Sequence, residues 1–170
     1  MTTPTTSNAS PATHSSLTAK QALDRFVELI RTTNVVQDVT PDRLQQTIGV
    51  PINIETPEHY GYGQALSGEW AFSVERQIPS SGHPEVSLSF DPLPGKDASS
   101  KDICDPDFAH VTGALEHMGF ARHSMRGEHD RWLFDYFERV GMRVEVYPFV
   151  SHSDTGEPIG PNCVRRVLLR

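Results

Sequence analysis

Residues 40–49, TPDRLQQTIG, and residues 105–119, DPDFAHVTGALEHMG, begin two stretches of the chain that share one order of features. Each opens with a hydroxyl or acid before Pro-Asp and ends in glycine. This is typical of a short helix, because Pro suits the first helical position and Gly the position after the last. Strand-like segments bearing a tryptophan follow each helix. The order predicts two α-β-β-β units, over residues 40–90 and 105–150. The spacings differ, so true duplication and two units built from common cap and turn chemistry both remain open.

A further helix is expected before the first unit, over residues 18–32. Thr18 followed by Gln21 forms a capping-box pattern, and apolar residues such as Leu23, Phe26 and Ile30 recur at helical spacing. By the same cap chemistry, Thr40 and Asp105 are the expected N-caps of the two repeated helices. The repeated units are thus preceded by one amphipathic helix.

Alternation of apolar and polar residues predicts the strands. Val86, Leu88 and Phe90 alternate with Ser87 and Ser89, which indicates a sheet with one buried and one wet face. Residues 120–126 and 131–138 are expected to form a hairpin, with further strands at 142–150 and 163–169. The fold class is therefore α+β with a mostly antiparallel sheet. The expected core includes the aromatic residues of both units, Trp70, Phe72, Trp132 and Phe134.

Length and composition favour one compact domain. The chain has 170 residues, of which 36% are hydrophobic, and residues 17–170 suit a single α+β domain. Residues 1–16 are rich in Ser, Thr and Pro, so we expect a disordered tail that can act as a tether. The formal net charge of -7 argues against nucleic acid as a partner and favours a partner that is basic or neutral at its contact face. Both a monomer and a dimer are compatible with these features.

The sequence carries no membrane or export signal. It has no apolar run of the roughly 18 residues that span a bilayer, and its first residues do not form a signal peptide. A cytoplasmic location is the expectation for the chain as written. If Met1 replaces a removed lipoprotein signal, the same tail would link a membrane anchor to a periplasmic domain.

Two cysteines, Cys104 and Cys163, lie far apart and outside any CxxC motif. In a cytoplasmic setting they would be buried thiols that behave as small apolar residues. The alternative is a disulfide that holds the C-terminal strand to the start of the second unit, which would favour an oxidising compartment.

No catalytic or metal-binding motif stands out. His110 and His117 lie seven residues apart on one predicted helix, a rise of roughly 10 Å, too far for both to bind one ion. There is no GxSxG elbow, and Gly61-Tyr62-Gly63 lacks the remaining glycines and the lysine of a phosphate-binding loop. We therefore expect no enzyme activity, no cofactor and no metal site.

Two predicted turns combine acids with histidine or tyrosine. Tyrosine offers large contact area at modest entropic cost, and carboxylates steer basic partners, so these turns are a candidate partner-binding patch. The alternative is that they are ordinary polar turns. The candidate residues are Glu55, Glu58, His59, Tyr60 and Tyr62 in the first unit and Glu128, His129 and Asp130 in the second.

Several segments together resemble a family of small proteobacterial proteins. They are residues 17–49, His59-Tyr60-Gly61-Tyr62-Gly63, residues 119–129 and Cys163-Val164-Arg165-Arg166. Some members resemble immunity proteins of type VI secretion or other polymorphic toxin systems. The resemblance implies a protein that binds a cognate antibacterial toxin and neutralises it by occluding its active site. It carries over no catalytic residue, because the class has none in common.

Two other functions remain open at the level of sequence. One is an envelope or complex-assembly adaptor, in which the α/β units bind another subunit through a strand edge or a helix groove. The other, less favoured, is a metal-dependent enzyme.

Overall fold

The computed structural model describes residues 16–66 and 68–170, so the predicted tail lies, except for Ser16, outside the described residues. The helices and strands are as follows: α1 (Ala19–Arg31), the 3-10 turn η1 (Val36–Asp38), α2 (Pro41–Ile48), β1 (Asn53–Thr56), β2 (His59–Ala65), β3 (Trp70–Gln77), β4 (Glu85–Pro92), η2 (Ser100–Ile103), α3 (Phe108–His117), β5 (Ala121–Arg126), η3 (Glu128–Asp130), β6 (Trp132–Arg139), β7 (Met142–His152) and β8 (Pro158–Leu169).

The eight strands form one antiparallel sheet in the order β1-β2-β3-β4-β8-β7-β6-β5. Each half of the chain contributes a meander of four neighbouring strands, and the two halves meet through their last strands, β4 and β8. The predicted α+β class with an antiparallel sheet, preceded by an N-terminal helix, is confirmed. The units match by strand order and not by the tryptophans, because Trp70 lies on the third strand of its unit and Trp132 on the second of its own.

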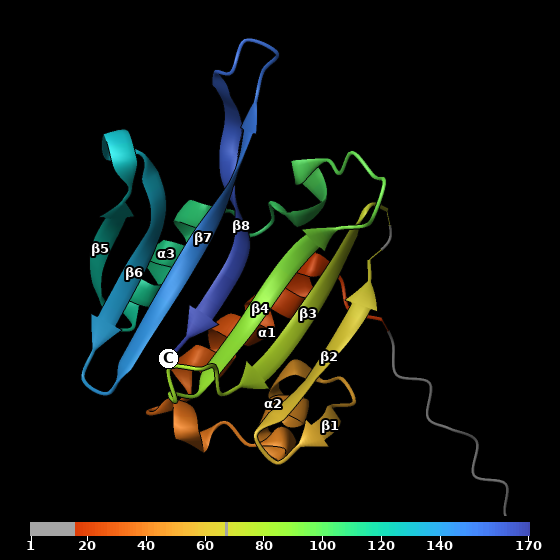
Figure 1. The fold of residues 1–170 in the computed structure, drawn as a ribbon, viewed down its shortest axis with the longest axis vertical. Coiled ribbons are helices and arrows are strands. Elements are labelled where there is room, and N and C mark those ends of the chain that lie inside the picture. The colour runs from red at the N-terminus through yellow and green to blue at the C-terminus, as the bar shows by residue number, and fades with distance from the viewer. Residues whose placement is uncertain (1–15, 67) are drawn as a thin grey trace, which may run out of the picture.

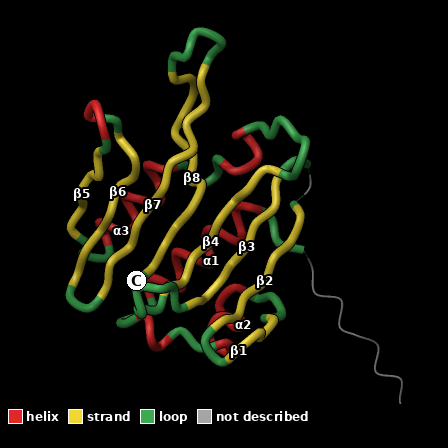
Figure 2. Tube along the Cα trace, in the orientation of Figure 1, coloured by secondary structure: helices red, strands yellow, loops and turns green. Residues whose placement is uncertain are grey.

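The α-helices pack on one face of this sheet, and the other face has no helix over it (Figures 1 and 2). The buried residues include Val86, Leu88 and Phe90 of β4 and Leu23, Phe26 and Ile30 of the expected stripe of α1, each 1% exposed or less, whereas Val27 of that stripe is partly buried. Since side chains alternate along a strand, the residues between the buried ones point to the uncovered side. We call this uncovered side the open face.

Local capping chemistry explains where the helices begin. Thr18 accepts a hydrogen bond from the backbone N–H of Gln21 at 3.1 Å, and the Gln21 side chain accepts one from the N–H of Thr18, which completes the predicted capping box. Thr40 caps α2 as expected, and Gly49 follows it with φ +78°, a conformation that glycine adopts at little cost.

The expected cap of α3 is wrong. Asp107, not Asp105, accepts the hydrogen bond from the N–H of His110, at 2.9 Å, and the helix begins at Phe108. A capping side chain accepts a hydrogen bond from the N–H two or three residues after it. Asp105 and Pro106 both precede the N-cap position, which Asp107 occupies.

Two further sequence predictions concern the core and the cysteines. Trp70 and Phe72 are buried, but Phe134 is only half-buried and lies on the open face. Cys104 and Cys163 form a disulfide that joins the segment before α3 to β8. Of the two alternatives for the cysteines, the structure therefore contains the covalent link. In the described part of the chain, no helix is long and apolar enough to cross a membrane.

Replacing both cysteines by serine should lower the free energy of unfolding by about 2–4 kcal/mol, because the cross-link closes a loop with a sequence separation of 59 residues and restricts the unfolded chain. Chemical denaturation with and without reductant measures this. The native protein should lose stability on reduction and the double variant should not. Equal stability of native and variant protein under oxidising conditions would contradict the prediction.

Candidate binding surfaces

The open face divides into two unlike halves along the centre of the sheet. Cross-strand pairing aligns its residues in rows that run from β2 to β6. Apart from Glu75, the rows in the β2–β4 half contain small residues, and in the β8–β6 half they contain large ones. The small set is Gly61, Gly63, Ser73, Ser87 and Ser89, and the large set is Leu168, Arg166, Tyr147, Tyr136 and Phe134.

A buried carboxylate organises the large half. Glu145 on β7 is 2% exposed and accepts hydrogen bonds from Arg143 at 3.0 Å, Tyr147 at 2.6 Å and Arg170 at 3.2 Å. Burial, together with the bond to Glu145, raises the pKa of Tyr147 to about 12. The hydroxyl of Tyr147 therefore stays protonated and fixed as a donor at neutral pH.

Aromatic contacts extend this order across three strands. The Arg143 guanidinium lies 4.0 Å from the ring centre of Tyr136, and Tyr136 stacks on His123 of β5 at 4.9 Å. Phe134 packs on Tyr147 with ring centres 4.5 Å apart. The large half is thus an ordered aromatic and arginine surface.

The small half carries a groove of about 250 Å³ beside the edge strand β1. His59 bridges two carboxylates at this groove, with Nδ1 2.9 Å from Glu55 and Nε2 2.5 Å from Glu75. The hydrogen bond with Glu75 raises the pKa of His59, and the nearby charge of Glu55 adds to it. Gly61 has no room for a side chain, since an added Cβ would lie 2.3 Å from the carbonyl oxygen of Val74, whereas one at Gly63 would meet its nearest neighbour at 3.8 Å.

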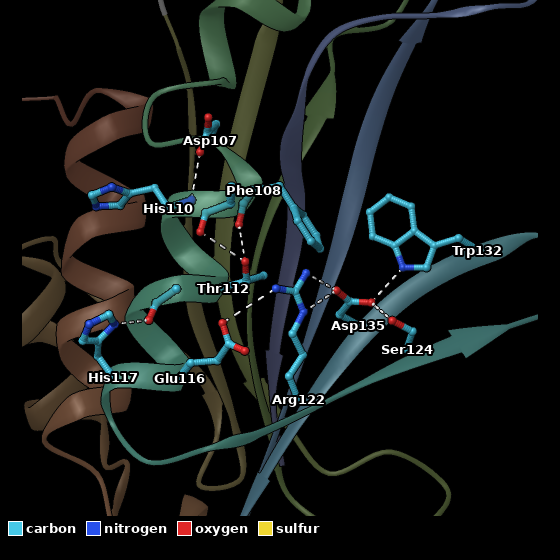
Figure 3. A network of polar contacts seen from close by, with 12 residues as sticks. Asp107, Phe108, His110, Thr112, Glu116, His117, Arg122, Ser124, Trp132 and Asp135 are labelled. Carbon is cyan, nitrogen blue, oxygen red and sulfur yellow. Dashed lines mark hydrogen bonds and ion pairs between the residues drawn. The ribbon is translucent and has the colours of Figure 1, made fainter.

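A second buried carboxylate, Asp135, lies on the helix-covered side between β6 and α3 (Figure 3). It accepts hydrogen bonds from Arg122 at 2.6 and 2.9 Å, from Ser124 at 2.7 Å and from the Trp132 indole at 2.8 Å. Arg122 also lies 3.7 Å from Glu116 of α3. Burial alone would raise the pKa of Asp135, but these hydrogen bonds outweigh it and lower the pKa. The network ties the edge strand β5 to β6 and α3, which is a structural role.

A hollow of about 630 Å³ lies where η1 meets the β3–β4 and β6–β7 turns, and Arg139, Arg143 and Arg170 line it. Arg139 donates to the carbonyl of Thr33 at 2.7 Å, while the other two bond to Glu145. These three guanidinium groups already have partners, so the hollow offers little to an anionic ligand.

The structure separates the candidate residues predicted from the sequence. Glu55, Glu58 and His59 lie in or beside the β1–β2 hairpin, near one edge of the sheet, whereas residues 128–130 lie in the β5–β6 turn near the other edge. They do not form one patch.

The two tyrosines of the first group are largely taken up by packing. Tyr60 is 3% exposed and donates to the Val39 carbonyl at 2.5 Å, so it presents almost no surface to a partner. Tyr62 is half-buried, and its hydroxyl lies 3.3 Å from Gln64.

Sequence reasoning missed the cluster around Glu145 and the network around Asp135. The one signal for the first was the alternation of Arg143, Glu145 and Tyr147 with Val144 and Val146, which marks a polar strand face. Among the described residues, no group of three or more His, Cys, Asp or Glu is placed to hold a metal ion.

Comparison with protein-family models, with curated proteins and with solved structures finds no match to this chain, so its function has to be inferred from its own residues.

Replacing Asp135 by Asn should destabilise the protein by about 2 kcal/mol at pH 7, because the Arg122 guanidinium and the other donors lose a charged acceptor. The lowered pKa means that Asp135 stabilises the fold above the ordinary aspartate pKa and that this contribution is lost as the pH falls through the lower folded value.

Denaturation at pH 7 and near pH 2.5 measures both effects. The variant should lose less stability on acidification than the native protein, while Asp154→Asn, in an exposed turn, should behave like the native protein. A D135N variant with unchanged stability at pH 7 would contradict the structural role assigned to the network.

Proposed function

We propose that this protein is an immunity protein that binds a cognate antibacterial toxin and neutralises it by occluding its active site. The observation that carries the proposal is the hairpin of β7 and β8. These strands have 11 and 12 residues, against 8 for β3 and β4, and the hairpin extends well beyond the neighbouring strands (Figure 1). A projecting hairpin of this kind is suited to entering a cleft.

The tip of the hairpin is acidic and ordered. Asp154 and Glu157 are exposed, and the turn between them is held by hydrogen bonds from the N–H of Ser153 to Glu157 and from the N–H of Gly156 to Ser153, at 2.8 and 2.9 Å. A turn that is ordered before binding loses less entropy when it docks. Its carboxylates favour a cleft lined by basic groups, in keeping with the net charge of -7.

The base of the hairpin is fastened to the body of the protein. The Cys104–Cys163 disulfide holds β8, Phe149 packs edge-on against Trp70 at 5.3 Å, and Ser151 donates to Ser100 at 2.9 Å. These contacts support the hairpin as a stiff element that can exclude substrate from a cleft.

The β5–β6 turn lies at the same end of the sheet (Figure 2). It contains Glu128, His129 and Asp130, and Arg126 donates to the carbonyl of Asp130 at 3.0 Å. In the proposed complex this group would extend the contact made by the hairpin, whereas the group around Glu55 lies at the far end.

Reversing the charge of the tip with Asp154→Lys and Glu157→Lys should weaken toxin binding by at least tenfold and abolish protection, because like charges would then face a basic cleft. The partner to use is the product of the adjacent gene. Affinity is measured by titration calorimetry, and protection by growth of cells that express the toxin.

The matched control is Glu55→Lys with Glu58→Lys, which makes the same change in charge at the opposite end and should leave both readouts unchanged. No binding of the native protein and no rescue of growth would overturn the proposal. An equal loss of toxin binding in the test and control variants would show that the hairpin is not the binding element.

The disulfide favours a second candidate, an adaptor in the bacterial envelope, because such bonds persist in oxidising compartments. The exposed edge strand β5 would then accept a strand from another subunit. Fractionation of the source cells separates the two: recovery with periplasmic or membrane proteins, in complex with an envelope subunit and without a toxin, would favour the adaptor.

A further inference from the structure

We propose that the open face binds a second copy of this chain, through a two-fold axis that lies parallel to the strands between β4 and β8. The inference goes beyond the toxin-binding proposal and does not rest on it, because the tip of the hairpin lies beyond the rows of residues that would form this contact. The small half of each copy would then face the large half of the other.

The order of the strands fixes which elements meet. The sheet reads β1-β2-β3-β4 from one edge and β5-β6-β7-β8 from the other. A two-fold axis along its centre therefore places β4 of one copy over β8 of the other, β3 over β7, and β2 over β6. Such aligned packing is the usual arrangement of two stacked sheets.

The register then decides which residues face each other. One row of pairs runs from Gly61 through Ser87 and Leu168 to Tyr136, and the next row runs from Gly63 through Ser89 and Arg166 to Phe134. The rotation keeps each row at its own height along the strands. The facing pairs of unlike size are Gly61 with Tyr136, Gly63 with Phe134, Ser73 with Tyr147 and Ser89 with Arg166. Ser87 and Leu168 also face each other, but they are only 7% and 2% exposed in a single copy.

Each of these pairs sets a small residue against a large one, which is how facing layers interdigitate at high packing density. Gly61 and Gly63 are among the residues that line the groove beside β1, and in the proposed pair the aromatic rings of β6 would enter this groove. Phe134 and Tyr136 are only half-buried in a single copy, and this contact would cover them.

Charge favours the same rotation. The small half of the face carries Glu55, Glu75 and Glu85, and the large half carries Arg143, Arg166 and Arg170 together with Glu138. Within one copy, Arg143 already pairs with Glu145 and Glu138, and Arg170 with Glu145 and Glu85. Glu75 would face Glu145, whose charge these two arginines already balance. A two-fold axis parallel to the sheet but perpendicular to the strands would instead place each half of one copy over the same half of the other. That arrangement would set acids against acids and large residues against large ones.

The footprint of the face is of the size of a standard interface. Eight strands at about 4.8 Å spacing and about seven residues in length give roughly 900 Å² per copy. A standard protein interface takes about 800 Å² from each partner.

The first test is the mass of the full chain in solution, by sedimentation equilibrium from about 1 to 100 μM. We expect a dimer of twice the 18.9 kDa chain. Gly63→Leu should raise the dissociation constant of this dimer at least tenfold, because the new side chain occupies the space that Phe134 would fill. The backbone at Gly63 does not need glycine, and a Cβ there meets only ordinary contacts, so the variant should fold.

A complementary pair of variants gives the decisive result. Phe134→Ala should weaken its own dimer, yet a mixture of labelled G63L and F134A chains should form a heterodimer more tightly than either variant pairs with itself. In that heterodimer one contact sets the introduced leucine side chain against the space that the missing phenylalanine ring leaves, and the other contact is native.

Gly113→Leu, in α3 and away from the face, is the matched control and should keep the native dimer; near this glycine an added Cβ meets no atom within 4 Å. Circular dichroism establishes that each variant is folded. A native chain that is monomeric throughout the concentration range, a G63L variant that dimerises as well as the native chain, or a mixture with no preference for the heterodimer would each overturn the proposal.

Discussion

The pairing of β4 with β8 is the interaction on which the rest of the structure depends. Val86 lies opposite Leu169 and Leu88 opposite Val167, and all four side chains are fully buried. Without this pairing the two halves of the chain would be separate four-stranded meanders, each with an unpaired inner edge. With it, the helices rest on one continuous sheet, and the uncovered side becomes a single surface eight strands wide.

Joining the halves in this way also determines what the open face presents. Each half alternates apolar and polar residues, so each buries one side, but the side chains left on the other side differ. The β4 half leaves serines, the neighbouring glycines of β2 and carboxylates, while the β8 half leaves aromatic and arginine side chains ordered by Glu145. A surface built from these two units is therefore asymmetric in both volume and charge. That asymmetry favours one specific geometry of association over nonspecific hydrophobic association.

Much of the fold could be predicted because its causes are local. The capping box at Thr18, the cap at Thr40 and the alternation in β4 are set by residues within a few positions of each other. The faces of β6 could not be assigned in this way. Phe134 and Phe137 fall on opposite sides, and Asp135 rather than Phe134 points toward the helices. Asp135 is tolerated there because Arg122 and Ser124, on another strand, satisfy its charge, and no local pattern reveals such a partner.

For the same reason, the predicted binding patch combined residues that lie near opposite edges of the sheet. The cluster around Glu145 could not be predicted either. Those residues become neighbours only after β7 is paired on both sides. The prediction of the N-cap of α3 was wrong for a local reason. Two aspartates flank Pro106, and only the second, Asp107, lies where it can accept a hydrogen bond from the first free N–H groups of the helix. Turn and cap chemistry thus determines the helices and strands, while pairing between residues far apart in the sequence determines the surfaces.

The central position of β8 has a consequence for synthesis on the ribosome. β4 is complete long before β8, so its inner edge has no partner strand while more than sixty further residues are made. During that interval the nascent first half leaves backbone hydrogen-bonding groups unpaired along this edge, which promotes association with other chains. The serines that alternate with the apolar residues of β4 keep one side of this strand polar before β8 pairs with it. Because β8 is the last strand made and lies at the centre of the sheet, the two halves can join only after its residues up to Leu169 have been made.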